Sequence, residues 1–145
     1  AQGRYRIGLD YPSYVPVMES ARNTATRERL WRAFQNQGGA ANLKTLGELT
    51  QKRRAYARLF DQPSYADFVL RRRMAGNVAN VERFLGEVKL AVAQRERSDI
   101  DELRAVKAAE LQQPLERTSL RRWDTSYYLE RAKRERFNLD QNSFR

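Results

Sequence analysis

The segment between Asn77 and Pro114 limits the fold of this chain more than any other. Asn77 can cap a helix and Pro114 cannot continue one, so a single helix is predicted from Val78 to about Leu111. Apolar residues recur at helical spacing near both ends of this segment, at Val78, Val81, Leu85, Val88 and Val92 and again at Leu103, Val106 and Leu111. The polar run QRERSDID at 94–101 interrupts the stripe, so the middle of the helix is expected to be exposed, bent or in contact with a partner.

Four further helices follow from caps and apolar periodicity. They are expected from Asn23 to the Gly38-Gly39 pair, from about Asn42 to Phe60, from Ser64 onward, and from near Trp123-Asp124 to Phe137. The alternation at Tyr5, Ile7 and Leu9 predicts a short strand or extended arm that turns at Pro12, and Pro16 is expected to keep the following residues extended. The sequence therefore predicts an all-α chain of about five helices with short connections, forming one helical region over 1–145 without an internal boundary.

The chain contains neither histidine nor cysteine. Disulfides, thiolate catalysis and zinc sites built from imidazole or thiolate are therefore excluded, and a carboxylate-only site would favour magnesium or calcium. No apolar run is long enough to span a bilayer, and the N-terminal residues do not resemble a secretory signal. The composition leaves the compartment open between cytoplasm and periplasm.

Two charged groups are candidates for a site. Glu96, Asp99, Asp101 and Glu102 form a dense acidic group that could hold an oxygen-loving cation, but pairing with nearby arginines at the solvent surface is favoured. The triplet at 71–73 could bind phosphate, yet no glycine-rich phosphate loop accompanies it, and a charged helix end is favoured. No catalytic, cofactor-binding or metal-binding residue is assigned.

The stretch RRWDTSYYLERAKRERF at 121–137 places aromatic residues in basic surroundings. With a net charge of +10, this pattern leaves open a small basic helical module that binds nucleic acid. Acidic residues are interleaved with the arginines, however, as on solvated helix faces, so nucleic acid is not the favoured partner. Packing between helices is favoured for Trp123, Tyr127 and Tyr128; Trp123 and Tyr127 share a helix face, and Tyr128 can point elsewhere.

Several stretches together resemble the zinc metallopeptidase family of thimet oligopeptidase, neurolysin and bacterial oligopeptidase A. The residues that carry this resemblance are LDYPSYVPVM (9–18), RERLWRAF (27–34), PSYADFVLRRRMA (63–75), VERFLGEV (81–88) and WDTSYYLERAKRERFNLDQNSFR (123–145). Relatives often have an arginine where this chain has Gln37, so any contact of that arginine is not carried over.

The resemblance implies a non-catalytic fragment of a large, mostly helical peptidase with a deep channel for short peptides. In that family a His-Glu-x-x-His helix binds zinc downstream of the region represented here. The implied partners are the remaining catalytic part of the parent chain and short peptides as parent substrates. No membrane partner is expected, because no apolar run is long enough to span a bilayer. The fragment alone is expected to be inactive and to self-associate through exposed apolar surface, with Tyr127 and Tyr128 as candidates for lining the parent's channel. Peptide specificity and oligomeric state are left undefined.

Overall fold

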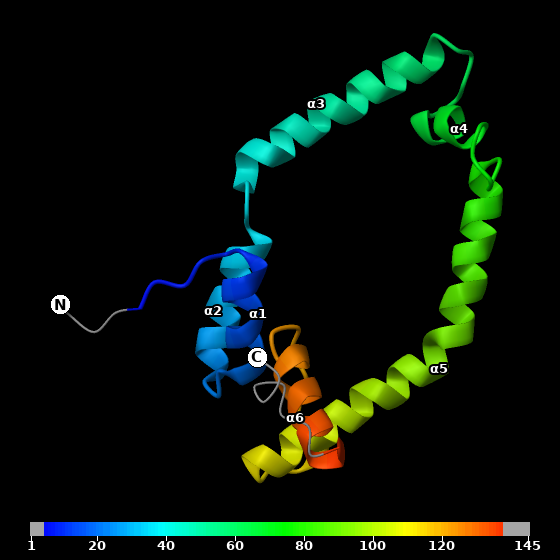
Figure 1. Cartoon of the computed structure of the whole chain (residues 1–145). Helices are drawn as coiled ribbons and strands as arrows, with labels where there is room; N and C mark the ends of the chain where they lie inside the picture. Colours follow the sequence, from blue (N-terminus) through cyan, green and yellow to red (C-terminus); the bar gives the residue numbers. More distant parts are fainter. Residues whose placement is uncertain (1–4, 138–145) are drawn as a thin grey trace. The chain divides into compact units, whose positions relative to one another are not determined.

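The computed structural model describes residues 5–137, and these residues form helices without any strand (Figure 1). In chain order the elements are α1 (Tyr11–Ser20), α2 (Thr24–Gln35), α3 (Gly39–Arg58), α4 (Tyr65–Leu70), α5 (Val78–Leu111), the 3-10 turn η1 (Leu115–Arg117) and α6 (Thr125–Phe137). The all-α prediction is confirmed, and all five expected helices are present. The last eight residues of the stretch 123–145 lie outside the described part of the chain.

Side-chain caps begin three of the expected helices. In each case the side-chain oxygen accepts a hydrogen bond from the backbone N–H three residues further on, at Asn23 (3.1 Å), Ser64 (3.1 Å) and Asn77 (2.8 Å). Ser64 also donates its hydroxyl to the carboxylate of Asp67 at 2.6 Å. Local polar chemistry therefore fixes these boundaries.

The expectation that the chain stays extended beyond Pro12 and Pro16 is wrong, because residues 11–20 form the helix α1. Asp10 caps it by accepting a hydrogen bond from Ser13 N at 2.9 Å, and Pro12 lies in the first turn, where a missing N–H costs nothing. Pro16 lies inside the helix, yet packing overrides its preference because it places Met18 in a buried position. Only residues 5–10 precede the helix as non-helical backbone.

The helices pack as two compact units, Ala1–Gln37 with Glu96–Arg145 and Gly38–Arg95. In the first unit α1 contacts both α2 and α6. The core of this unit contains Leu103 of α5 together with Tyr127 and Tyr128 of α6. The helix α5 contributes residues to both units. That residues 1–145 form a single helical region without an internal boundary stays a prediction.

In the second unit an aromatic cluster joins α3 to α4. The ring of Phe68 lies 5.1 Å from Tyr56 and 4.9 Å from Phe60, and Tyr65 stacks on Phe68 at 6.0 Å. Within this unit, Ala57 is the one described residue that is fully buried, and leucines along α3 remain exposed. The expected interruption in α5 is confirmed as an exposed segment at 94–101. Within residues 5–137, no helix is both long and apolar enough to cross a membrane.

Two glycines near the start of α3 are expected to respond oppositely to alanine. A Cβ at Gly47 would meet nothing within 4 Å in the described chain. Gly47→Ala should stabilise the chain by about 0.5–1 kcal/mol, because glycine has the greater unfolded-state freedom. Gly38→Ala should destabilise it by about 1–2 kcal/mol, because φ is +83° at Gly38. Urea denaturation checks both, and equal signs would contradict this assignment.

Candidate functional site

The centre of the first unit is a buried cluster of three charges. Asp124, which precedes α6, accepts hydrogen bonds from Arg27 Nη2 at 2.7 Å and from Lys107 Nζ at 2.5 Å. Arg27 and Asp124 are both 0% exposed. Buried charges persist only when they are paired and hydrogen-bonded. One carboxylate therefore links α2, the C-terminal part of α5 and the start of α6.

The remaining donors of the two cations are also used. Arg27 donates to the carbonyl oxygens of Ala21 (2.7 Å) and Trp123 (3.2 Å) and to other acceptors beside α2. Lys107 donates to the Ser119 carbonyl at 2.9 Å. The guanidinium of Arg27 also lies 4.3 Å from the centre of the Tyr127 ring, a cation–π contact. Since these donors are satisfied inside the protein, the cluster joins segments and does not present a free cation to a ligand.

The pKa of Asp124 lies below its ordinary value of 3.8. Burial alone would raise this pKa, but hydrogen bonds from Lys107, Arg27 and the backbone of Arg121 outweigh the burial. The ionised carboxylate is thus the form that the fold stabilises. This assignment gives the cluster a defined pH dependence.

The structure places both Tyr127 and Tyr128 in the core, with exposed fractions of 3% and 2%. Their rings meet edge to face at 5.0 Å, and both pack in the same core cluster, as favoured from the sequence. Burial raises the pKa of both tyrosines. At Tyr127 a hydrogen bond that its hydroxyl donates to Glu110 at 3.0 Å raises the pKa further. Neither ring offers a free face on which a nucleic-acid base could stack.

Trp123 precedes α6 and packs against α2. Its ring lies 5.7 Å from Trp31 and 5.5 Å from the guanidinium carbon of Arg32. The indole Nε1 is buried and finds no acceptor within residues 5–137. A buried donor without a partner is uncommon in folded proteins, and Trp123 Nε1 is such a donor within residues 5–137.

Two members of the acidic group on α5, Asp101 and Glu102, form ion pairs. Asp101 accepts a hydrogen bond from Arg104 at 2.7 Å, as expected, whereas Glu102 pairs with Arg136 of α6 at 2.9 Å. No group of three or more metal-binding side chains occurs within the part of the chain that the structure describes. Because the whole sequence also lacks histidine and cysteine, its residues do not fit a zinc ion.

The basic triplet follows α4. Arg71 is the C-cap residue of that helix, and its guanidinium lies 4.5 Å from the centre of the Phe68 ring. Arg72 and Arg73 are exposed. The favoured reading of the triplet as a charged helix end agrees with these positions.

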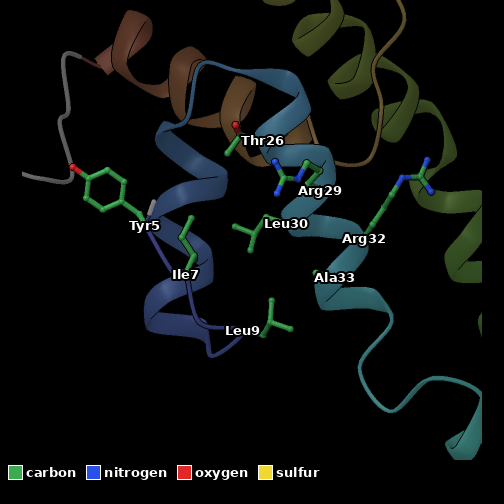
Figure 2. Close-up of a pocket in the computed structure, with 8 residues that line it drawn as sticks. All are labelled: Tyr5, Ile7, Leu9, Thr26, Arg29, Leu30, Arg32 and Ala33. Carbon is green, nitrogen blue, oxygen red and sulfur yellow. The ribbon is translucent and has the colours of Figure 1, made fainter. Parts of the chain in front are cut away.

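A pocket of about 930 Å³ lies between the N-terminal residues and α2 (Figure 2). Its apolar lining comes from Ile7, Leu9, Leu30 and Ala33, while Tyr5 is directed away from these side chains. Thr26, Arg29 and Arg32 complete the lining. Arg32 is already paired with Glu28 at 2.8 Å. The pocket is open and mainly apolar, without a nucleophile and base in contact.

Two adjoining pockets of about 480 and 340 Å³ lie beside α3 and α4. Both are lined by Arg53 of α3 and by Tyr65 of α4. Arg53 lies 5.2 Å from the centre of the Tyr65 ring. Sequence reasoning missed this groove, and it also missed Arg27 and Lys107 of the buried cluster. The sequence signal was weak, because the chain has 28 basic residues and the local sequence does not indicate which of them are buried.

Comparison with known proteins identifies the family. The family model described as Peptidase family M3 matches residues 17–145. Probable cytosolic oligopeptidase A of Arabidopsis thaliana is 28% identical over 146 residues, which cover 99% of this chain and 20% of that protein. Oligopeptidase A of Escherichia coli (strain K12) is 30% identical over 149 residues, covering 97% and 21%, and saccharolysin of Saccharomyces cerevisiae is 28% identical over 139 residues, covering 94% and 19%. The chain spans about a fifth of the length of these relatives, and it belongs to peptidase family M3.

Proposed function

We propose that this chain is a non-catalytic helical scaffold within a zinc-dependent oligopeptidase, and that the whole protein hydrolyses peptide bonds in short peptides. The observation that carries the proposal is the match to peptidase family M3 over 17–145, by a chain that covers about a fifth of relatives named oligopeptidase A. The sequence without histidine and cysteine supports a purely structural role, because zinc and its activated water need ligands that another part of the protein must supply.

The buried charge cluster supports this role physically. Arg27, Lys107 and Asp124 form hydrogen bonds with one another and with nearby backbone. These bonds hold three helical segments together. None of them is left as a general base or nucleophile. Such an arrangement positions a surface, and the chemistry belongs to the part of the protein that this surface meets.

The proposal extends to one tyrosine hydroxyl beside the substrate channel. Tyr127 already donates to Glu110, whereas the Tyr128 hydroxyl has no hydrogen-bond partner within residues 5–137. Tyr128 is therefore the member of the pair that remains for a channel-lining role. The exposed leucines of α5 supply apolar surface that the remaining catalytic part would cover, or that a second copy would cover when this chain is isolated.

Zinc calorimetry and a peptide-hydrolysis assay on the 145-residue chain test the proposal. We expect no stoichiometric zinc uptake and no cleavage of a quenched fluorescent peptide, whereas the whole protein should cleave the peptide and lose that activity to a chelator. Tight one-to-one zinc binding, or cleavage by the 145-residue chain alone, would overturn the scaffold assignment. A whole protein that is inactive with zinc bound would overturn the oligopeptidase assignment.

A further inference from the structure

The groove beside α3 and α4 combines a basic edge with an apolar floor. Its two adjoining pockets share Arg53 and Tyr65, and Lys52 and Arg54 add further positive charge. Leu49, Tyr56 and Pro63 supply the apolar lining. These residues all belong to the second compact unit, so the groove depends only on how α3 and α4 pack together.

The cations of this groove are not neutralised internally. Within residues 5–137, no carboxylate forms an ion pair with Lys52, Arg53 or Arg54. The sequence of α3 contains five basic residues and one acidic residue, Glu48. This differs from the first unit, where Arg27 and Lys107 share Asp124. The positive charge on α3 is therefore available to a ligand.

The apolar floor is open along the same helix. Leu46 and Leu49 are 52% and 40% exposed, and they precede Arg53 on α3 at intervals that place the three residues on one face. Tyr56, one turn beyond Arg53, is held by Phe68. An arginine in the middle of an exposed apolar stripe suits a ligand whose apolar side chains alternate with carboxylates.

We propose that this groove is an interaction surface for an acidic, amphipathic peptide segment, with Arg53 and Arg54 binding its carboxylates and Leu46 and Leu49 contacting its apolar side chains. A second copy of this chain fits less well, because two surfaces with the same excess of positive charge would repel each other. Nucleic acid also fits less well. The rings that could stack on bases are engaged, since Tyr65 contacts Arg53 and Phe68, and Tyr56 contacts Phe60 and Phe68. This surface acts whether or not the whole protein cleaves peptides.

Fluorescence anisotropy with the 145-residue chain tests the proposal. The probe is a labelled, end-capped peptide of about 15 residues, long enough to form a helix, with leucine at helical spacing and glutamate between. It should bind more weakly as salt is raised. Arg53→Gln together with Arg54→Gln should weaken binding about tenfold, since each exposed ion pair changes affinity a few-fold. Leu49→Ser should weaken it as well, and circular dichroism should show unchanged helix content in each variant.

The matched control is the pair Arg72→Gln and Arg73→Gln, which removes the same charge from the same unit at exposed positions that line neither pocket. This variant should bind the probe within about twofold of the unaltered chain, because removed charges act weakly through screened solvent. An equal loss in this control would show a net-charge effect and overturn the proposal. Equal binding of the same peptide with glutamine in place of glutamate would also overturn the proposal. Tighter binding of a thymidine oligonucleotide of equal charge would favour nucleic acid and overturn it, and so would self-association of the chain that excludes the probe.

Discussion

Replacing Asp124 with alanine is expected to lower the free energy of unfolding by about 3–5 kcal/mol, the range found when one partner of a buried ion pair is removed. The change leaves Arg27 and Lys107 buried without their shared carboxylate. Because small domains are stable by only about 5–15 kcal/mol, much of the stability of the first unit depends on this residue. Urea denaturation followed by circular dichroism measures the loss.

Asp101→Ala is the matched control, because Asp101 also pairs with an arginine at 2.7 Å but is a solvent-exposed residue. We expect that change to cost at most about 1 kcal/mol. The cluster also predicts a pH dependence. Since the pKa of Asp124 is lowered on folding, its stabilisation is complete above about 3.8 and is lost as pH falls through the lower pKa of the folded state. Asp124→Ala should remove that acid-sensitive component, and equal losses in the two variants would contradict the cluster's role.

Tyr128→Ala is expected to destabilise the chain by about 3–5 kcal/mol, the usual cost of deleting a buried aromatic ring. Tyr128 is packed beside Tyr127 and Leu103 and lies 5.7 Å below the ammonium of Lys107. Tyr128→Phe should instead change stability by less than about 1 kcal/mol, because the hydroxyl has no hydrogen-bond partner within the described residues. The same urea titration separates the two substitutions.

Leu129→Ala provides the control for position on α6, because Leu129 is the next residue and is exposed. It should have little effect on stability. In the whole protein, Tyr128→Phe separates packing from channel lining, since a raised KM at unchanged stability would locate the hydroxyl beside the substrate. If Tyr128→Phe destabilised the chain as much as Tyr128→Ala, the assignment of Tyr128 as a packed ring with a free hydroxyl would be wrong.

The sequence predicts the helices of this chain well because capping side chains close to the boundary determine where several of them begin. Asn23, Ser64 and Asn77 cap the helices that follow them, as their side chains indicate. The helix α1 was missed because two prolines argue locally for extended backbone. The contrary evidence, a cap at Asp10 and burial of Met18 against neighbouring helices, depends partly on contacts between distant residues.

The buried cluster could not be predicted for a related reason. Asp124 was placed correctly near the start of α6, where a carboxylate is favourable, but its partners lie 97 and 17 residues away. Nothing in the local sequence distinguishes Arg27 from the many arginines on solvated helix faces. Packing of both Tyr127 and Tyr128 was predicted from the sequence, whereas the element they pack against, the C-terminal part of α5, was not.

The mass of the natural gene product tests the central claim most directly. We propose that these helices are the non-catalytic scaffold of a family M3 peptidase, and the relatives that the chain matches are about five times its length. Intact-mass spectrometry of the protein purified from its natural source should therefore give a polypeptide several times larger than 17.0 kDa, with zinc bound by residues outside this segment. A natural polypeptide of 17.0 kDa that cleaves no peptide would contradict the account.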